Sequence, residues 1–372
     1  MPTRRQTLLL PAALWARPAA PAARVESIEV ISRQPELYHG WPSMIRRANG
    51  ELVVVFSGGR ESHVCPFGRL EMMVSRDDGR TWSWPQVLMD SPIDDRDAGI
   101  LETPRGTLLA TTFTSLAYES RLEKQEGWPE DRLRRWQAVN RRAGGEQRRS
   151  LLGCWMLRSE DGGLTWSAPF RVPVNSPHGP VALSSGRLLY AGKQLWEPEA
   201  RNGVAESTDD GRTWRWLSGI PTRPGDRPQD YHELHAVETA SGRVIVQIRN
   251  HNTANRGETI QCESGDGGST WSIPHAIGVW GLPSHLLRLR DGRLLMSYGY
   301  RRKPYGNQAR VSTDGGGTWS GPITISGDGA GGDLGYPSTV ELADGRLLTV
   351  WYERMNTSPM AVLRLARWVL RG

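Results

Sequence analysis

The chain has 372 residues and a formal net charge of +6, and its arginines are not interleaved with aromatic residues as a nucleic-acid surface requires. Its 42 glycines, 25 prolines and 16 tryptophans favour many short strands joined by turns and argue against a helical protein. After the N-terminal segment no apolar run is long enough to span a bilayer, and the three cysteines lack the spacing of a zinc site or a disulfide framework.

Residues 1–23 have the features of an export signal. Arg4 and Arg5 precede a short apolar run, and a stretch rich in alanine and proline follows as far as Ala23. This order is typical of a twin-arginine signal that is cleaved after export, and a disordered basic tail is the alternative. We therefore expect an exported protein, periplasmic or extracellular, whose single folded domain spans residues 24–372.

Six β-hairpins are predicted along the rest of the chain. In each, a short apolar run leads into a turn that contains glycine, and a second apolar run follows, which is typical of paired antiparallel strands. The turn glycines are Gly50, Gly106, Gly186, Gly242, Gly292 and Gly345.

The phrase Ser-x-Asp-x-Gly-x-Thr-Trp follows each of the first five hairpins. Its aspartate can accept hydrogen bonds from backbone N–H groups, its glycine allows a positive φ, and its tryptophan is a large apolar anchor. A hairpin followed by an outer pair of strands is a four-stranded propeller blade, and such repetition indicates a ring. We predict an all-β, six-bladed β-propeller in which a strand at residues 25–33 completes the sixth blade. The five phrases begin at Ser75, Ser159, Ser207, Ser264 and Ser312.

The spacing is regular except in the second blade, where residues 117–149 intervene. The stretch from Glu130 to Val139 predicts an amphipathic helix with a basic face. This helical insertion in blade two is either a solvated surface helix or a lid that contacts the substrate.

Hairpin geometry converts sequence offsets into spatial neighbours, because residues equally far before and after a turn lie side by side. Glu233 lies nine residues before Gly242 and Arg249 seven after it, so we expect both at one end of the fourth inner hairpin. Tyr336 and Glu353 have a similar relation to the turn of the sixth hairpin. Because inner hairpins converge on the axis of a propeller, these ends of all six are expected to line one depression.

Polar and titratable residues concentrate at this register. They form either a site for a substrate or a set of groups that satisfy one another at a solvated mouth. The candidates are His39, Arg60, His63, Asp95, Arg96, Asp97, His178, Glu233, His235, Arg249, His285, Arg302, Tyr336 and Glu353, with Arg301 as an alternative to Arg302.

The repeated Ser-x-Asp-x-Gly-x-Thr-Trp phrase on a hairpin-rich chain resembles the Asp boxes of the sialidase superfamily. The segment ELHAVETASGRVIVQIR, from Glu233 to Arg249, is similar to the one that joins the catalytic glutamate to an arginine of the family's carboxylate-binding triad. The segment GYPSTVELADGRLLTVWYE, which contains Tyr336, resembles the one that carries the nucleophilic tyrosine. The resemblance implies a retaining glycosidase with Tyr336 as nucleophile, Glu233 as its base and Arg249 as a ligand of the substrate carboxylate.

Three positions depart from the family pattern. Gly40 stands where the family has its first triad arginine, although Glu353, which would brace that arginine, is present. Lys303 lies in the region of the third arginine. The region of the family's acid/base aspartate contains no aspartate, so this role is expected from one of Glu61, His63, Asp95 and Asp97.

Together these features predict a glycoside hydrolase that removes a terminal, acidic sugar from a glycan or glycoconjugate, with Tyr336, Glu233 and Asp97 as catalytic residues. A propeller that binds glycan without cleaving it is the alternative, favoured by the glycine at position 40. We expect no metal ion, no other cofactor, no nucleic-acid partner and no membrane span.

Overall fold

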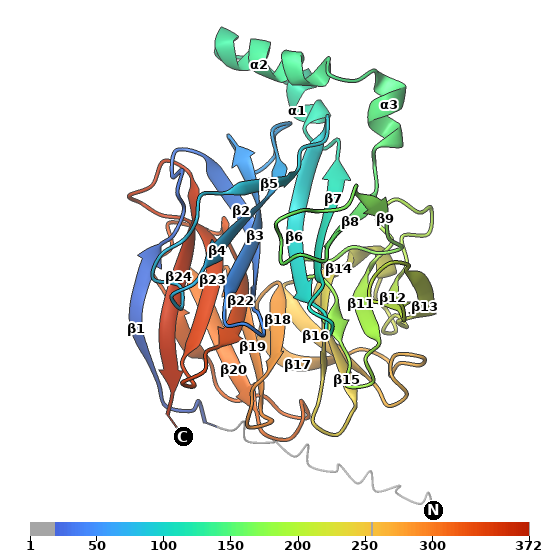
Figure 1. Ribbon diagram of the computed structural model, residues 1–372, viewed down its shortest axis with the longest axis vertical. Coiled ribbons are helices and arrows are strands. Elements are labelled where there is room, and N and C mark those ends of the chain that lie inside the picture. The colour runs from blue at the N-terminus through green and yellow to red at the C-terminus, as the bar shows by residue number, and fades with distance from the viewer. Residues whose placement is uncertain (1–18, 254–255, 372) are drawn as a thin grey trace, which may run out of the picture.

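Each predicted hairpin forms the inner strands of one antiparallel sheet, and the strands that follow it complete a four-stranded blade. The computed structural model describes residues 19–253 and 256–371 and contains six such sheets, arranged as a ring (Figure 1). In blades one to five the strands follow one another in chain order from the inner to the outer edge. The chain therefore builds the ring one blade at a time.

The first three blades precede the middle of the chain. Blade one consists of β2 (Tyr38–Arg46), β3 (Leu52–Arg60), β4 (Arg69–Ser75) and β5 (Gln86–Met89). Blade two consists of β6 (Asp94–Glu102), β7 (Leu108–Ser115), β8 (Cys154–Ser159) and β9 (Phe170–Arg171). Blade three consists of β10 (Val181–Ala182), β11 (Leu188–Lys193), β12 (Asn202–Ser207) and β13 (Arg215–Gly219).

The last three blades complete the ring. Blade four follows a short 3-10 helix, η1 (Pro228–Asp230), and consists of β14 (Tyr231–Glu238), β15 (Val244–Asn250), β16 (Glu258–Ser264) and β17 (His275–Trp280). Blade five consists of β18 (Ser284–Arg288), β19 (Leu294–Tyr300), β20 (Gly306–Ser312) and β21 (Ile323–Ser326). Blade six consists of β22 (Leu334–Glu341), β23 (Leu347–Arg354), β24 (Ala361–Leu370) and β1 (Ala23–Val30).

Strands from both ends of the described chain close the sixth blade. β1 pairs antiparallel with β24, with Val25 opposite Trp368. The backbone N–H of Arg371 donates to the Ala22 carbonyl at 2.7 Å and extends the pairing. The predicted six-bladed, all-β propeller with an N-terminal closing strand is therefore confirmed. Residues 1–18, which include the arginine pair of the predicted export signal, lie outside the described residues.

The five repeated phrases, which we call the Asp–Trp turns, join the third and fourth strands of blades one to five. In the first turn, Oδ1 of Asp77 accepts hydrogen bonds from the Ser75 hydroxyl and from the Thr81 backbone N–H, both at 2.8 Å. The Trp82 indole donates to the Gly79 carbonyl at 3.2 Å. These bonds hold the turn closed around its aspartate, which explains the composition of the phrase.

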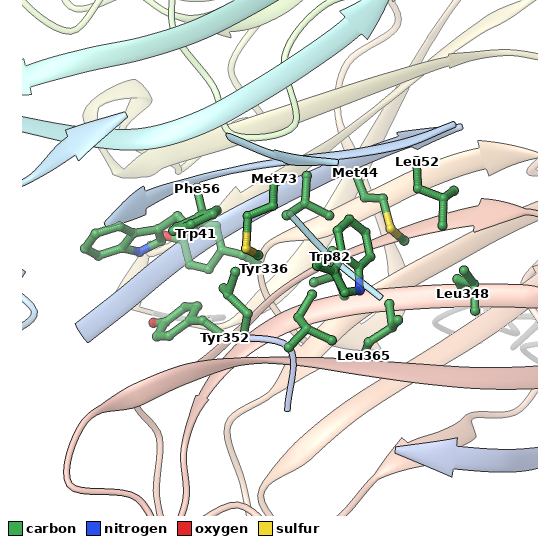
Figure 2. Close-up of a cluster of buried hydrophobic side chains, with 14 of the residues drawn as sticks. Trp41, Met44, Leu52, Phe56, Met73, Trp82, Tyr336, Leu348, Tyr352 and Leu365 are labelled. Carbon is green, nitrogen blue, oxygen red and sulfur yellow. The ribbon is translucent and has the colours of Figure 1, made fainter. Parts of the chain in front are cut away.

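Trp82 also packs the first blade against the sixth. It is 6% exposed and belongs to a cluster that contains Leu348 and Leu365 of blade six. Figure 2 shows Trp41 and Tyr352 at one end of this cluster and Leu348 at the other. The apolar core between these two blades therefore continues up to the residues of the candidate site.

The helical insertion lies between β7 and β8 and contains α1 (Glu119–Glu123), α2 (Glu130–Asn140) and α3 (Gly145–Ser150). Trp136 of α2 is fully buried in a cluster with Cys65. The Trp136 indole and the Arg132 guanidinium both donate to Oε1 of Glu61, in the loop after β3. The insertion is thus a packed cap at the end of the ring where β6 begins (Figure 1). No helix in the described chain is long and apolar enough to cross a bilayer.

Candidate active site

Four inner strands share one backbone irregularity at the same end of the ring. Trp41, Asp97, Glu233 and Tyr336 each lie nine residues before the turn glycine of their hairpin, and their φ angles are 53°, 49°, 46° and 54°. The pairing register shifts at each of these residues, which places them in β-bulges. Left-handed φ is uncommon for residues with a Cβ, and bulges redirect side chains. The bulges therefore turn four side chains out of the regular strand alternation.

Two of these four side chains are in direct contact. The Tyr336 hydroxyl donates a hydrogen bond to Oε1 of Glu233, and Nη1 of Arg249 donates to Oε2 of the same carboxylate at 2.5 Å. Nη1 of Arg249 also donates to the Tyr336 oxygen at 3.0 Å. Arg249 reaches this position because it pairs with His232, the residue before the Glu233 bulge. Hairpin offsets thus bring a phenol, a carboxylate and a guanidinium into one cluster.

Burial and charge decide where the protons of this cluster lie. Burial and the charge of Glu233 raise the pKa of Tyr336 well above its usual value, so the phenol is protonated at neutral pH. Burial by itself would raise the pKa of Glu233, but the Arg249 guanidinium and the Tyr336 hydrogen bond lower it below its usual value. The pair is therefore a neutral phenol beside a carboxylate that can accept its proton.

Asp97 supplies a second carboxyl group with the opposite preference. Burial, and then repulsion from Glu233, raise the pKa of Asp97 to about 7. Two carboxyl groups whose environments separate their pKa values are the pattern of an acid and a base in one site. The alternatives suit the role less well. Glu61 is bound by the helical insertion, and burial lowers the pKa of His63. Burial also raises the pKa of Asp95 to about 7, but its carboxylate is fully buried and accepts two hydrogen bonds from Ser91. Asp97 therefore fits the proton donor.

A cavity of about 360 Å³ lies beside this cluster, between blades four and five. The Arg302 guanidinium lies 4.6 Å from the centre of the Trp280 ring in its wall, and the Arg301 guanidinium lies 5.8 Å from the Tyr336 ring. A positive cavity with an aromatic wall suits an anionic ligand that contains a ring. Four guanidinium groups line it, and three of them form no ion pair with a carboxylate among the described residues; the four are Arg249, which binds Glu233, and Arg256, Arg301 and Arg302.

Aromatic rings border the site beside the nucleophile candidate. The Trp41 and Tyr336 rings meet edge to face with centroids 6.4 Å apart, and the Arg96 guanidinium lies 4.5 Å from the Trp41 ring. His63 packs edge-on against Trp41 at 5.0 Å, and its Nδ1 lies 3.0 Å from a carboxylate oxygen of Asp333. Arg96 and His63 therefore lie at the border of the site, where the hairpin offsets placed them.

The profile of the family described as BNR repeat-like domain matches residues 122–349, which is more than half of the chain. The chain belongs to this family. Among curated proteins, this BNR-repeat protein is 28% identical over 203 residues to a sialidase of Micromonospora viridifaciens, covering 46% of this chain and 31% of that protein. It is also 28% identical over 206 residues to a xyloglucanase of Paenibacillus sp, covering 49% of this chain and 19% of that protein. The chain thus spans less than a third of either relative.

Solved structures are similar over the whole ring of the BNR-repeat protein. A protein of unknown function from Dyadobacter fermentans matches with a TM-score of 0.77 at 25% identity, over 94% of this chain and 99% of that chain. The intramolecular trans-sialidase of Ruminococcus gnavus matches with a TM-score of 0.67 at 14% identity, over 92% of this chain and 97% of that chain. The sialidase-like propeller predicted from the repeats is therefore confirmed as the fold.

Two of the predicted substrate contacts in the BNR-repeat protein are buried between blades one and two instead. Arg60 is fully buried and donates two hydrogen bonds to the carboxylate of Asp94, at 2.6 and 3.0 Å. Asp95 is equally buried, and its carboxylate accepts from the backbone N–H and the hydroxyl of Ser91 at 2.8 and 2.7 Å. Both have the right offset from their turns, but their side chains point into the blade junction, which corrects the prediction.

His39 and Glu353 are corrected for a similar reason. His39 is 1% exposed and packs edge-on against Phe56, with its Nδ1 3.0 Å from the Ser32 hydroxyl. The Glu353 carboxylate is fully buried and accepts from the Arg364 guanidinium at 2.7 Å and from the Trp351 indole at 2.8 Å. It therefore binds an arginine of its own blade.

Three predicted histidines lie in a different layer of the ring. His178, His235 and His285 line a second cavity, near the hairpin turns of the inner strands, and do not line the arginine-rich cavity. His235 lies two residues after the Glu233 bulge along β14, so it is further from the Tyr336 cluster and nearer the hairpin turn. Their predicted role in the same site as Tyr336 is therefore wrong.

Arg256 and Trp280 line the arginine-rich cavity although the sequence did not single them out. Arg256 precedes β16, and Trp280 is the last residue of β17. An Asp–Trp turn joins the end of β16 to the start of β17. Arg256 and Trp280 lie at the opposite ends of these two strands, on the side of the ring that carries the Tyr336 cluster. The distance of Arg256 and Trp280 from this Asp–Trp turn in the sequence could therefore have identified them as residues of the site. Between the two alternatives for the third arginine, Arg301 is the one that lies against Tyr336.

Proposed function

We propose that this BNR-repeat protein is an exported glycoside hydrolase that removes a terminal acidic sugar from a glycan with retention of configuration. The observation that carries the proposal is the contact of the Tyr336 hydroxyl with both Glu233 and Arg249. A phenol that touches a proton acceptor and a fixed positive charge is an activated nucleophile. The curated relatives, a sialidase and a xyloglucanase by name, support action on glycans. Export rests on the Arg4–Arg5 pattern.

In the first step, the Tyr336 oxygen attacks the anomeric carbon while Glu233 takes the phenolic proton. Asp97 gives its proton to the glycosidic oxygen, the bond from this oxygen to the anomeric carbon breaks, and the rest of the glycan leaves. The Arg249 guanidinium stabilises the negative charge that develops on the phenol oxygen. The sugar is then bound covalently to Tyr336.

In the second step, the Asp97 carboxylate takes a proton from a water molecule, and the water oxygen attacks the anomeric carbon from the other face. The bond to Tyr336 breaks, and the phenolate recovers its proton from Glu233. Two displacements at the same carbon restore the original configuration. A neutral phenol is a suitable nucleophile here, because a carboxylate would repel an anionic sugar.

The arginine-rich cavity supports an acidic substrate. Three of its four guanidinium groups form no ion pair with a carboxylate among the described residues, so they are free to bind an anionic group of a ligand. Arg249 donates to the Tyr336 oxygen and Arg301 lies 5.8 Å from the centre of the Tyr336 ring, so both can bind a carboxylate on the anomeric side of the sugar. Gly40 provides no third arginine. The substrate carboxylate would therefore be bound by Arg249 and Arg301 alone, and not by the three arginines that the family resemblance implies.

A screen of aryl α- and β-glycosides, including a sialoside and uronides, tests the proposal on wild type, Tyr336→Phe and the matched control Tyr305→Phe. We expect turnover of an acidic glycoside by wild type and by the control, and none by Tyr336→Phe. A fluorinated glycoside with a good leaving group should then label Tyr336, which peptide mass mapping detects. Turnover that survives Tyr336→Phe unchanged would rule out this nucleophile.

A glycan-binding propeller without hydrolytic activity is the second candidate. The observation that favours it is the buried Trp41 beside Gly40, where the resemblance implies an arginine of the substrate clamp. Binding of the wild type on a glycan array, together with no turnover of any glycoside in the screen, would select this candidate.

A further inference from the structure

Three histidines from blades three, four and five meet at the centre of the ring, apart from the Tyr336 cluster. The ring centroids of His178 and His235 are 5.3 Å apart, those of His178 and His285 5.0 Å, and those of His235 and His285 4.7 Å. Each residue is at most 8% exposed. The proposed hydrolysis uses none of them, so their close approach needs another explanation.

Hydrogen bonds at Nδ1 determine which nitrogen of two of these rings carries the proton. Nδ1 of His235 accepts from the backbone N–H of Leu286 at 2.9 Å, and Nδ1 of His285 accepts from that of Thr339 at 3.4 Å. Burial lowers the pKa of His285 to about 3 and that of His235 well below its usual value, so both rings are neutral. A neutral imidazole that accepts at Nδ1 carries its hydrogen on Nε2. His235 and His285 therefore each present an N–H donor.

His178 has the opposite tautomer. The Ser43 hydroxyl donates to the Ala98 carbonyl at 2.7 Å, which leaves the Ser43 oxygen to accept from Nδ1–H of His178 at 3.2 Å. Burial, with repulsion from the two neighbouring histidines, lowers the pKa of His178 well below its usual value. Its Nε2 is then an acceptor, and this buried atom has no hydrogen-bond partner in the part of the chain that the structure describes. The three rings together offer two donors and one acceptor.

These rings line a cavity of about 380 Å³, which we call the axial cavity. Its other walls are the last residues of the inner strands β2, β6, β18 and β22, next to the hairpin turns. The Tyr336 cluster lies toward the first residues of the inner strands. The axial cavity is therefore at the other end of the ring and shares no lining residue with the arginine-rich cavity.

The wall of the axial cavity carries unbalanced positive charge. Arg46 and Arg288 line it, and neither forms an ion pair with a carboxylate within residues 19–253 and 256–371. Nε of Arg46 is buried and has no hydrogen-bond partner among those residues. The two glutamates in the wall are engaged, since Glu102 and Glu341 each bind a different arginine, at 3.0 and 3.2 Å. Guanidinium groups of this kind prefer carboxylate partners.

The tautomers argue against a metal ion in this cavity. A histidine binds a metal through an unprotonated nitrogen, but Nε2 of His235 and His285 carries hydrogen and Nδ1 of each is occupied. Consistent with this, no group of three or more His, Cys, Asp or Glu side chains in the described chain is arranged to hold a metal. Oxygen atoms of an organic ligand match the pattern, since hydroxyl groups both accept and donate.

We propose that the axial cavity is a second ligand site, for a small hydroxylated carboxylate such as a sugar acid. The carboxylate of the ligand lies against Arg46 and Arg288. Its hydroxyl groups accept from Nε2–H of His235 and His285 and donate to Nε2 of His178. A cavity of about 380 Å³ is in the range that holds a single sugar ring. This site does not depend on the proposed hydrolysis, because the two sites share no residue.

Histidine ring resonances of the full-length, isotope-labelled protein test the site directly. The spectrum without ligand should show Nε2–H tautomers for His235 and His285 and an Nδ1–H tautomer for His178. Addition of D-glucuronate should shift the Nε2 resonances of all three in a saturable way. D-glucose, which lacks the carboxylate, should bind at least about tenfold more weakly. No saturable shift with D-glucuronate, or equal affinity for both sugars, overturns the proposal.

Variants separate this site from the mouth of the propeller. Arg46→Gln combined with Arg288→Gln should weaken the glucuronate-induced histidine shifts about tenfold or more, because both charged partners are lost. Arg249→Gln should leave these shifts unchanged, and so should Arg105→Gln, an exposed control for net charge. An equal loss in the Arg105 variant, or disappearance of the shifts in the Arg249 variant, would overturn the assignment. The wild-type titration decides the question even if the double variant does not fold.

Discussion

The Tyr336 hydroxyl donates a hydrogen bond to Oε1 of Glu233 although 103 positions of sequence separate the two residues. The contact joins the inner strands of blades six and four, and both residues have a left-handed φ. Such backbone conformations persist only where the surrounding structure holds them in place. The ring therefore supports this pair at some cost in local strain, and we expect the pair to act as one chemical unit.

Glu233→Gln preserves the shape of the side chain but removes the proton acceptor. We expect kcat for the best aryl glycoside to fall by about 10²–10⁴, with a much smaller change in KM. Steady-state kinetics measures both constants. Glu238→Gln is the matched control, because Glu238 lies on the same strand and its carboxylate binds the Ser184 backbone N–H instead. A similar loss of kcat in both variants would contradict the assignment.

Asp97→Asn removes the proposed proton donor. Since the protonated form is active, wild-type kcat/KM for substrates with poor leaving groups should fall as the pH rises through about 7, the pKa to which burial and Glu233 raise Asp97. The variant should lack this alkaline limb. Nitrophenyl glycosides should restore much of its kcat/KM, which reports the first step, because their leaving group needs no proton. An alkaline limb that survives in the variant would assign the acid to another residue.

The same substitution changes how stability depends on pH. Folding raises the pKa of Asp97 from the ordinary 3.8 to about 7, so the native state binds this proton more tightly than the unfolded chain does. The resulting stabilisation is fully present below about pH 4 and is lost as the pH rises through about 7. The Tm of Asp97→Asn relative to wild type should therefore increase between about pH 5 and about pH 8. Calorimetry at the two pH values measures this difference, and a pH-independent difference is the contrary result.

Arg301→Gln tests the anionic character of the substrate. Loss of a guanidinium that contacts a carboxylate should raise KM for an acidic aryl glycoside by about tenfold to a hundredfold. The kinetic constants for a neutral aryl glycoside, if it is turned over, should change little. Arg293→Gln is a control of equal charge at a distant hairpin turn, where Arg293 binds Asp291. An equal change in KM for acidic and neutral substrates would show that Arg301 does not bind the negative charge of the substrate.

Trp82 of the first Asp–Trp turn and Trp84, which lies just after it, allow a test of how the blades are held together. Trp82 is 6% exposed and lies in the core between blades one and six, whereas Trp84, two residues later, is 70% exposed. Trp82→Ala should lower the free energy of unfolding by about 3–5 kcal/mol. Trp84→Ala should change it much less, because little apolar surface is buried there. Denaturant unfolding of both variants gives the comparison, and equal losses would contradict the anchoring role.

The fold was predictable because the repeats record local geometry. A turn such as that at Gly242, with φ of 82°, needs glycine wherever it occurs. In each Asp–Trp turn the aspartate accepts the same two hydrogen bonds, from the serine hydroxyl and from the threonine backbone N–H. These local signals fix the number of blades and the strand order. The offset of Glu233 and Arg249 from one turn also predicted their contact, since pairing in a hairpin follows directly from its turn.

Side-chain direction was much less predictable. Arg60 and His39 lie at offsets that suit the mouth, yet they point into the interior because strand alternation and blade packing decide orientation. The bulges add a residue and reverse that alternation locally, and the sequence around Asp97 contains no obvious sign of one. The histidines illustrate the same limit, because a displacement of two residues along an inner strand places His235 in another cavity.

The bulge position also has a consequence for how such a ring can change over evolutionary time. Tryptophan, aspartate, glutamate and tyrosine occupy it in four blades with nearly the same φ, and proline occupies it in blades three and five. In these four blades the surrounding structure, and not the identity of the side chain, therefore maintains the left-handed backbone, which proline in the other two blades cannot adopt. Each of the four positions can therefore carry a different functional group on the same backbone conformation. At Trp41, one substitution would therefore place a new functional group beside Tyr336 on a backbone that already has the required conformation.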